Sequence, residues 1–175
     1  MTIAVARLDS MPDAEAAFKL AACCGSSAWV ARMLARRPFG TLKQLLTAAA
    51  DVAKTLTDDD WLEAFRHHPR IGRRNSNAVV STSAESWSAG EQSAVSAAST
   101  AVRAALVDGN ADYEARFGFI FIISASGKSA DEILAALRAR MGNEHDDEIR
   151  VAAAEQMKIT RLRLEKLTGG DGAPA

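Results

Sequence analysis

Phe117-Gly118-Phe119-Ile120-Phe121-Ile122-Ile123 is the one stretch of this chain that breaks a helical pattern. Apart from Gly118 it is aromatic and β-branched throughout, and such residues favour a buried strand. The sequence offers no second strong strand to pair with it, and a lone strand is unstable. We therefore expect an extended apolar segment near residues 117–124, packed among helices, whose backbone N–H and C=O groups find partners elsewhere in the protein or in a ligand.

Alanine and leucine dominate the chain on both sides of this segment, which favours helix. Residues 1–168 are predicted to form an all-α, single-domain multi-helix bundle of about eight helices, and residues 169–175 a disordered tail. Ser129-Ala130-Asp131-Glu132 is a capping-box pattern for the start of one helix, and Gly142 is a plausible stop for it. The expected helices span residues 12–23, 26–35, 40–54, 58–67, 89–107, 110–116, 130–141 and 147–167.

The composition argues against several classes of function. The net charge is -1 and no dense run of Lys and Arg occurs, which disfavours binding to nucleic acid. The longest apolar run is far too short to span a membrane, and no secretion signal is recognisable. Cys23 and Cys24 are adjacent and cannot readily bridge to each other, so they form no disulfide framework and only a poor metal pair. We expect a soluble protein of the reducing cytoplasm, in which both cysteines pack in a helix.

His68-Pro69-Arg70-Ile71-Gly72 follows the strongly helical run of residues 58–66. The proline pushes the backbone of His68 out of the α region, so the helix should stop there. An imidazole, whose unperturbed pKa lies nearest to neutral pH, would then project from a helix C-terminus, which suits acid–base chemistry. A histidine that merely interacts with the last carbonyls of a helix explains the residue equally well, and His67 fits that description too.

Ser88-Ala89-Gly90-Glu91-Gln92 stands at the expected start of the helix over residues 89–107. Ser at the N-cap and Glu three residues later form a capping box, which explains both residue types without a function. In the functional interpretation, Glu91 presents hydrogen-bonding groups with Ser88 and Gln92 at a helix N-terminus, where an anionic ligand is also favoured. Both interpretations can hold together.

Two further charged positions have competing explanations. Arg163 lies at the edge of the apolar stripe of the last helix, where it is either a surface arginine paired with an acid or a two-pronged ligand for a carboxylate. The spacing does not choose between them. His145, within the acidic residues 144–148, has no second metal ligand at a recognisable spacing, so we predict a solvated helix start there and no metal site.

Several short motifs follow one another along the chain. They are Cys23-Cys24-Gly25-Ser26, Trp29, Arg37-Pro38-Phe39, His68-Pro69-Arg70-Ile71-Gly72, Ser88 with Glu91-Gln92, Asn110, Tyr113, Phe117-Gly118-Phe119, Lys158-Ile159 and Arg163-Leu164. Each motif alone is weak. Together, in this order and spacing, they resemble the 2-oxo-4-hydroxy-4-carboxy-5-ureidoimidazoline (OHCU) decarboxylase family over roughly residues 8–168.

The resemblance implies a cofactor-free, usually dimeric, all-α enzyme of urate breakdown. Such an enzyme converts the hydrolysed product of hydroxyisourate, a small ureidoimidazoline, into (S)-allantoin and carbon dioxide. A non-catalytic helical dimeric binding or scaffold module that has kept this fold is the alternative, although a scaffold has no need to retain His68, Glu91 and Arg163 together. Hydrolysis of a related ureido compound is a weaker enzymatic alternative.

The resemblance also assigns roles to residues. His68 would be the catalytic acid–base residue, with Glu91 sharing the management of protons. The backbone from about Phe119 to Ser124 would line the pocket, and Arg163 rather than Arg161 would meet the substrate carboxylate or a ring oxygen. The conjugated C–N system of the substrate can accept the electron pair left by carbon dioxide, so no pyridoxal, thiamine or metal is expected. The expected substrate-binding residues are Pro69, Ser88, Gln92, Phe119, Phe121, Ile122, Ile123, Ser124 and Arg163.

Overall fold

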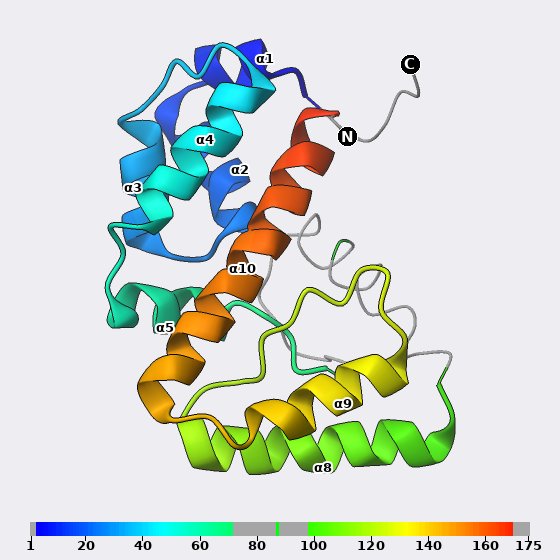
Figure 1. The fold of residues 1–175 in the computed structure, drawn as a ribbon. Coiled ribbons are helices and arrows are strands. Elements are labelled where there is room, and N and C mark those ends of the chain that lie inside the picture. The colour runs from blue at the N-terminus through cyan, green and yellow to red at the C-terminus, as the bar shows by residue number, and fades with distance from the viewer. Residues whose placement is uncertain (1–2, 72–86, 88–97, 170–175) are drawn as a thin grey trace. The chain divides into compact units, whose positions relative to one another are not determined.

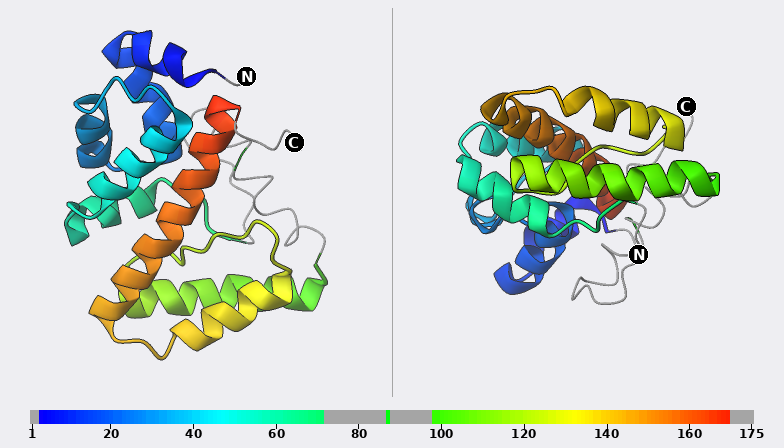
Figure 2. Two further views of the ribbon diagram at one scale, coloured as in Figure 1. Left: turned by 45° about the horizontal axis from the view of Figure 1, so that its top comes forward. Right: turned by 90° about the horizontal axis from the view of Figure 1, so that it is seen from below.

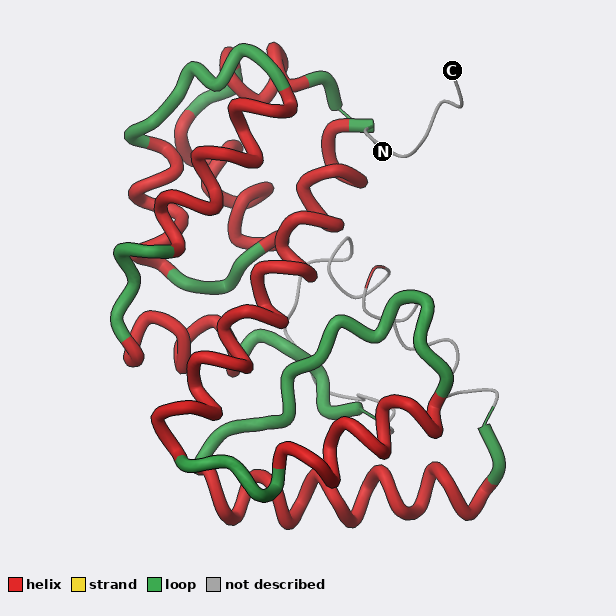
Figure 3. Tube along the Cα trace, viewed as in Figure 1, coloured by secondary structure: helices red, strands yellow, loops and turns green. Residues whose placement is uncertain are grey.

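The computed structural model describes residues 3–71, 87 and 98–169 (Figure 1). Regular structure in these ranges is helical, and no strand occurs within them (Figure 3). The all-α prediction is therefore confirmed. The helices of the described residues are α1 (Val5–Ser10), α2 (Asp13–Cys23), α3 (Ser27–Leu34), α4 (Leu42–Ala53), α5 (Asp58–Arg66), α8 (Thr100–Phe117), α9 (Ala130–Arg140) and α10 (His145–Thr168).

The described residues fall into two compact units. The first lies within Met1–Ala64 and Met157–Ala175, and the second lies within Phe65–Gln156. The boundary crosses α5 and α10, so each of these helices contributes residues to both units. The expectation of one helical domain over residues 1–168 stays a prediction. None of the helices in the described ranges combines the length and the hydropathy that crossing a membrane requires.

The first unit is built on contacts between helices that follow one another in the chain. Helix α2 packs against α3, and α3 packs against α4. Leu20, Trp29 and Leu45, one from each helix, are completely buried. Burial of such a side chain contributes about 1.5–3 kcal/mol to stability. The indole Nε1 of Trp29 donates to the carbonyl of Ala49 at 3.4 Å, so the one polar atom of this large side chain also has a partner.

In the second unit, α8 and α9 lie side by side (Figures 1 and 2). The sequence predicted two helices, over 89–107 and 110–116, but α8 runs without a break from Thr100 to Phe117. Gly109 does not interrupt it. A Cβ at this position would lie 2.9 Å from Cδ2 of Leu137 in α9, so the glycine permits a close helix approach. The predicted break is therefore wrong, because this glycine serves packing.

Other helix boundaries also differ from the expectation. Helix α1 was not predicted, and the expected helix over 89–107 is wrong at residues 98 and 99, which are not helical. Ser99 is instead an N-cap, whose hydroxyl accepts from the N–H of Val102 at 3.3 Å. Residues 88–97, with the expected capping box at Ser88, lie outside the described residues, as do residues 170–175 of the expected tail.

The apolar segment after α8 has the predicted character, although its start differs. Phe117 is the last residue of α8, and Gly118 ends the helix in the left-handed region at φ 76°. Residues 120–125 have no regular structure, and all of them are buried. Side chains serve as hydrogen-bond partners for this backbone: Arg140 binds the carbonyl of Ile122, and Glu155 binds the N–H of Ser124. The prediction of an extended apolar segment packed among helices is confirmed.

Candidate functional site

The end of α5 presents the two histidines. Asp60 accepts from the N–H of Thr57 at 2.9 Å at the start of this helix, where acidic residues are also favoured by the helix dipole. The helix ends at Arg66, and the N–H of His68 donates to the carbonyl of Phe65 at 3.1 Å in a final turn. His68 and Pro69 are partly buried, whereas His67 is exposed. The predicted helix stop at the His-Pro pair is therefore confirmed.

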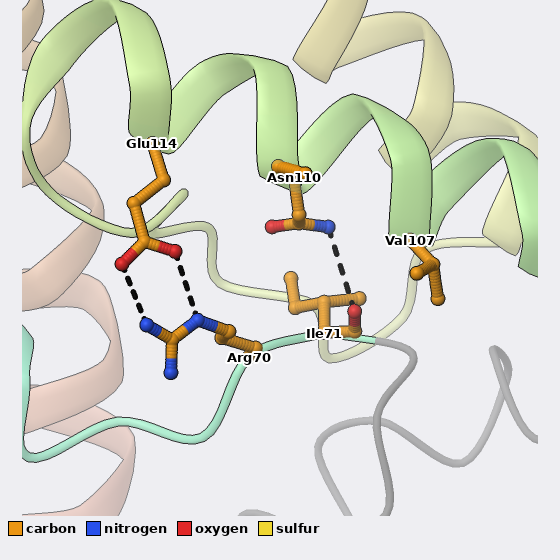
Figure 4. A pocket seen from close by; sticks show the side chains of 6 residues that line it. Arg70, Ile71, Val107, Asn110 and Glu114 are labelled. Carbon is orange, nitrogen blue, oxygen red and sulfur yellow. Dashed lines mark hydrogen bonds and ion pairs between the residues drawn. The ribbon is translucent and has the colours of Figure 1, made fainter.

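The chain that follows Pro69 is fixed to α8. Arg70 forms a two-pronged ion pair with Glu114, from Nε to Oε2 at 2.9 Å and from Nη2 to Oε1 at 2.6 Å (Figure 4). This hydrogen bonding raises the pKa of the Arg70 guanidinium. Asn110 donates from Nδ2 to the carbonyls of Leu106 at 2.7 Å and of Ile71 at 3.4 Å. Arg70 and Asn110 thus anchor the segment that carries His68.

A small cavity of about 150 Å³ lies beside this anchor (Figure 4). The Oδ1 atom of Asn110 is buried there, and no donor in the described part of the chain reaches it. The expected substrate-binding residues do not line this cavity. Its lining consists of Arg70, Ile71, Val107, Asn110, Ala111 and Glu114.

The extended segment forms a buried apolar wall, defined here as residues 119–124. Its aromatic rings pack on neighbours from two helices: Phe119 lies 5.4 Å from the Phe65 ring and 5.7 Å from the Tyr113 ring, centroid to centroid. Phe121 lies 5.2 Å from Tyr113. Because Phe65 is also the residue whose carbonyl accepts from His68, the structure brings the turn at His68 next to the start of the wall.

A buried polar network also supports the wall. Glu148 has no exposed surface, and it accepts hydrogen bonds from Arg140, from Nδ2 of Asn143 at 2.6 Å and from the hydroxyl of Tyr113. Arg140 in turn donates from Nη1 to the carbonyl of Ile122 at 2.7 Å. Burial, together with the bond to Glu148, raises the pKa of Tyr113 above the range of a free phenol.

The sequence gives only a weak indication of this network. The sequence predicts a solvated helix start at His145, which is exposed at the first residue of α10, but Glu148 in the same acidic run is completely buried. A carboxylate is buried only when it is paired, and its partner Arg140 is supplied by α9. The available signal was the position of Glu148, which is adjacent to Ile149, the first residue of the predicted apolar stripe. That position places Glu148 near the core face of α10.

Arg163 belongs to the first unit, where it is buried with only 4% of its surface exposed. Its Nη1 donates to the carbonyl of Ala22 at 3.3 Å, in the last turn of α2. Thr160, one turn earlier on α10, donates to the carbonyl of Cys23 at 3.4 Å. The C-terminal carbonyls of α2 carry partial negative charge, so they stabilise the guanidinium. Arg161 is exposed and pairs with Glu165 at 2.9 Å, so the surface-arginine explanation fits Arg161 and not Arg163.

The cysteines beside Arg163 are free and buried. Burial raises the pKa of the Cys23 thiol to about 12 and that of Cys24 to about 11, which leaves both protonated near neutral pH. Within the described ranges, no three His, Cys, Asp or Glu side chains gather as a metal site would require. Three of the expected site residues, Ser88, Glu91 and Gln92, lie outside the described residues.

The chain is similar to known proteins over nearly all of its length. The family model for OHCU decarboxylase matches residues 9–165. The chain is 39% identical over 145 residues to the uric acid degradation bifunctional protein TTL of Arabidopsis thaliana, an alignment that covers 83% of this chain and 45% of that protein. It is also 29% identical over 139 residues to the 2-oxo-4-hydroxy-4-carboxy-5-ureidoimidazoline decarboxylase of Haloferax volcanii. This alignment covers 79% of this chain and 80% of that protein.

A solved structure gives the same result. The fold is similar to that of an OHCU decarboxylase crystallised in the presence of (S)-allantoin, with a TM-score of 0.75 and 38% sequence identity, over 87% of this chain and 98% of that chain. The chain spans less than half the length of the bifunctional relatives that it matches, such as the Arabidopsis protein with 45%. Because the family model covers residues 9–165 and the fold agrees over most of the chain, this protein belongs to the OHCU decarboxylase family.

Proposed function

We propose that this chain decarboxylates 2-oxo-4-hydroxy-4-carboxy-5-ureidoimidazoline to (S)-allantoin and carbon dioxide in urate breakdown. The observation that carries the proposal is the turn at His68, which ends α5 and adjoins the buried apolar wall through Phe65. Family membership supports it, as do the names of the relatives: one is a uric acid degradation protein and another an OHCU decarboxylase.

The reaction breaks one C–C bond and moves protons. When carbon dioxide leaves, the bonding electron pair passes into the conjugated C–N system of the substrate, so the protein need only orient, polarise and protonate it. In the proposal, His68 and Glu91 manage the protons at the hydroxyl and at the carbon that becomes chiral. Protonation from one face then gives one enantiomer.

The other predicted residues bind and shield the substrate. Arg163 holds the carboxylate or a ring oxygen. Arg163 is buried on α10 against the last turn of α2, and this position supports its role over that of the exposed Arg161. The wall excludes water around the departing carboxylate, which strengthens electrostatic interactions there. Its burial supports that role. Ser88 and Gln92 bind the hydroxyl and ureido groups, and Pro69 packs beside the ring.

The proposal extends to assembly and location. We infer a homodimer in the cytoplasm that takes a small-molecule substrate and needs no cofactor. The two free, buried cysteines suit a reducing compartment. Sedimentation equilibrium of the purified chain measures the assembly, and a mass of one chain at micromolar concentration contradicts the dimer.

The decisive experiment compares His68→Asn with His67→Asn. Freshly generated substrate is supplied to each variant, and (S)-allantoin formation is followed by circular dichroism together with carbon dioxide release. We expect His68→Asn to lower kcat by 10²-fold or more, the contribution typical of a general acid–base group, and His67→Asn to stay within about twofold of wild type. Undiminished (S)-allantoin formation by His68→Asn contradicts the assignment. Release of ammonia in place of carbon dioxide by the wild type contradicts the reaction itself.

A further inference from the structure

Among the described residues, no strand lies beside the wall to bind its backbone. In a sheet, neighbouring strands bind the carbonyls and N–H groups, and a buried carbonyl without a partner is costly. Here the carbonyl of Ile122, whose side chain is 2% exposed, accepts from Nη1 of Arg140 at 2.7 Å. The guanidinium of Arg140 on α9 thus binds the carbonyl of Ile122, as Glu155 on α10 binds the N–H of Ser124.

The guanidinium of Arg140 also lies over the ring of a wall residue, Phe121. Its guanidinium carbon lies 4.6 Å from the centroid of the Phe121 ring and 5.9 Å from that of Tyr113, within the range of a cation–π interaction. One side chain therefore fixes both the ring of Phe121 and the carbonyl of the next residue. These two contacts hold the ring of Phe121 and orient the peptide unit between Ile122 and Ile123.

Arg140 is itself held in one position. Its Nε and Nη2 donate to Oε1 of Glu148 at 2.8 and 2.5 Å. Glu148 is completely buried, and it also binds Tyr113 and Asn143, so it cannot swing away. The side chain of Arg140 is 11% exposed. The guanidinium therefore connects a fixed carboxylate to the wall.

We propose that Arg140 is a positioning residue for the decarboxylation site: it touches no substrate but holds the backbone of the wall where the substrate binds. The inference rests on the proposed function, in which residues 119–124 line the pocket. Arginine suits the role because its planar fork donates in two directions at once. Lysine keeps the charge but cannot span Glu148 and the carbonyl of Ile122 with fixed geometry.

The test uses Arg140→Lys, with Arg116→Lys as the matched control. Arg116 has the same kinds of contact: its guanidinium lies 5.1 Å from the Phe117 ring, and its Nη2 donates to the carbonyl of Asn143 at 3.0 Å. Neither of these contacts involves the wall. Both variants are assayed for kcat and KM with freshly generated substrate, and for (S)-allantoin affinity by calorimetry. Folding is checked by far-UV circular dichroism and Tm.

We expect Arg140→Lys to lower kcat/KM by tenfold or more, with a raised KM and weaker (S)-allantoin binding, because a small displacement of positioning groups has large effects. A loss of folded protein alone would lower apparent kcat and leave KM unchanged. Arg116→Lys should stay within twofold of wild type. Arg140→Lys with wild-type kcat, KM and allantoin affinity overturns the inference.

A second variant covers the case in which Arg140→Lys does not fold. The double variant Arg140→Gln/Glu148→Gln removes both buried charges together, so neither is left without its counterpart. It should fold and show the same raised KM. If neither variant folds, Arg140 is only structural and the inference is wrong. An inactive wild type, in contrast, overturns the proposed function itself, so the two failures are distinguishable.

Discussion

Arg163 and Arg161 stand two positions apart on α10 and have different partners. Arg163 is buried against the C-terminal carbonyl of Ala22, whereas Arg161 is exposed and paired with Glu165 four residues later. An exposed pair of this kind contributes about 0.3–0.5 kcal/mol to a helix, so it explains Arg161 without any function. A buried arginine needs partners for its charge, and the carbonyl of Ala22 is one such partner of Arg163.

This difference predicts the outcome of paired substitutions. Arg163→Lys should lower kcat/KM by about 10- to 100-fold, because lysine cannot form a two-pronged bond with a carboxylate and a hydrogen bond to a charged group contributes about 1.5–3 kcal/mol. Arg161→Lys should stay within about twofold of wild type. Steady-state kinetics with freshly generated substrate measure both. Equal losses in the two variants would show that Arg163 has no special role.

At the scale of elements, the exit from α8 depends on one glycine. Gly118 ends the helix at φ 76°, and its N–H donates to the carbonyl of Glu114 at 2.9 Å. No atom lies within 4 Å of a Cβ built there, so the cost of a side chain is conformational and not steric. Because the wall begins at the next residue, this conformation sets the direction in which the wall leaves α8.

Gly118→Ala should therefore lower the free energy of unfolding by about 1–2 kcal/mol, the cost of placing an L-residue in the left-handed region. Gly142→Ala is the matched control, since Gly142 has no positive φ and its Cβ would meet the carbonyl oxygen of Ala139 at an ordinary 3.6 Å. Its effect should stay within about 0.5 kcal/mol. Urea unfolding followed by tryptophan fluorescence measures both, and equal effects would contradict this account of Gly118.

The elements that sequence reasoning predicted well are those that local chemistry determines. The capping box at Ser129 is present, and the helix before His68 stops where the proline requires. The predicted break between residues 107 and 110 is absent, because Gly109 permits the close approach of Leu137, a residue of another helix. The burial of Glu148 was not predicted for the same reason, since it depends on Arg140. Pairings between distant residues leave no periodic signal, so the support of the wall could not be predicted.

At the scale of the whole molecule, both units contain groups that burial keeps uncharged. In the first unit these are Cys23 and Cys24, whose thiol pKa values are raised to about 12 and about 11. In the second unit burial raises the pKa of the Tyr113 hydroxyl. The unfolded chain exposes the same groups with pKa values of about 8.5 for a thiol and about 10 for a phenol. As the pH rises, the unfolded chain therefore loses these thiol and phenol protons before the folded chain does, and the stability of the fold depends on pH.

The sign of the resulting pH dependence follows from this difference. Below about pH 8.5 the thiols are protonated in both states, and stability does not depend on them. Above that pH the unfolded chain releases protons that the folded chain retains, so the free energy of unfolding should fall, by about 1.4 kcal/mol per pH unit for each thiol. The fall should continue until the folded pKa values of about 11 and about 12 are reached. Urea titrations between pH 7 and 11 measure this slope.

The double variant Cys23→Ala/Cys24→Ala separates the thiols from the other alkaline groups. It removes two buried sulfurs, so its stability at pH 7 should be lower than that of wild type by the cost of the cavities. Its stability should nevertheless fall less steeply between pH 9 and 11, because only Tyr113 and the exposed groups still titrate. The quantity compared between the two proteins is the slope of the free energy of unfolding against pH, and not the free energy at any one pH. A double variant with the slope of wild type would show that the buried thiols do not carry the alkaline sensitivity of the molecule.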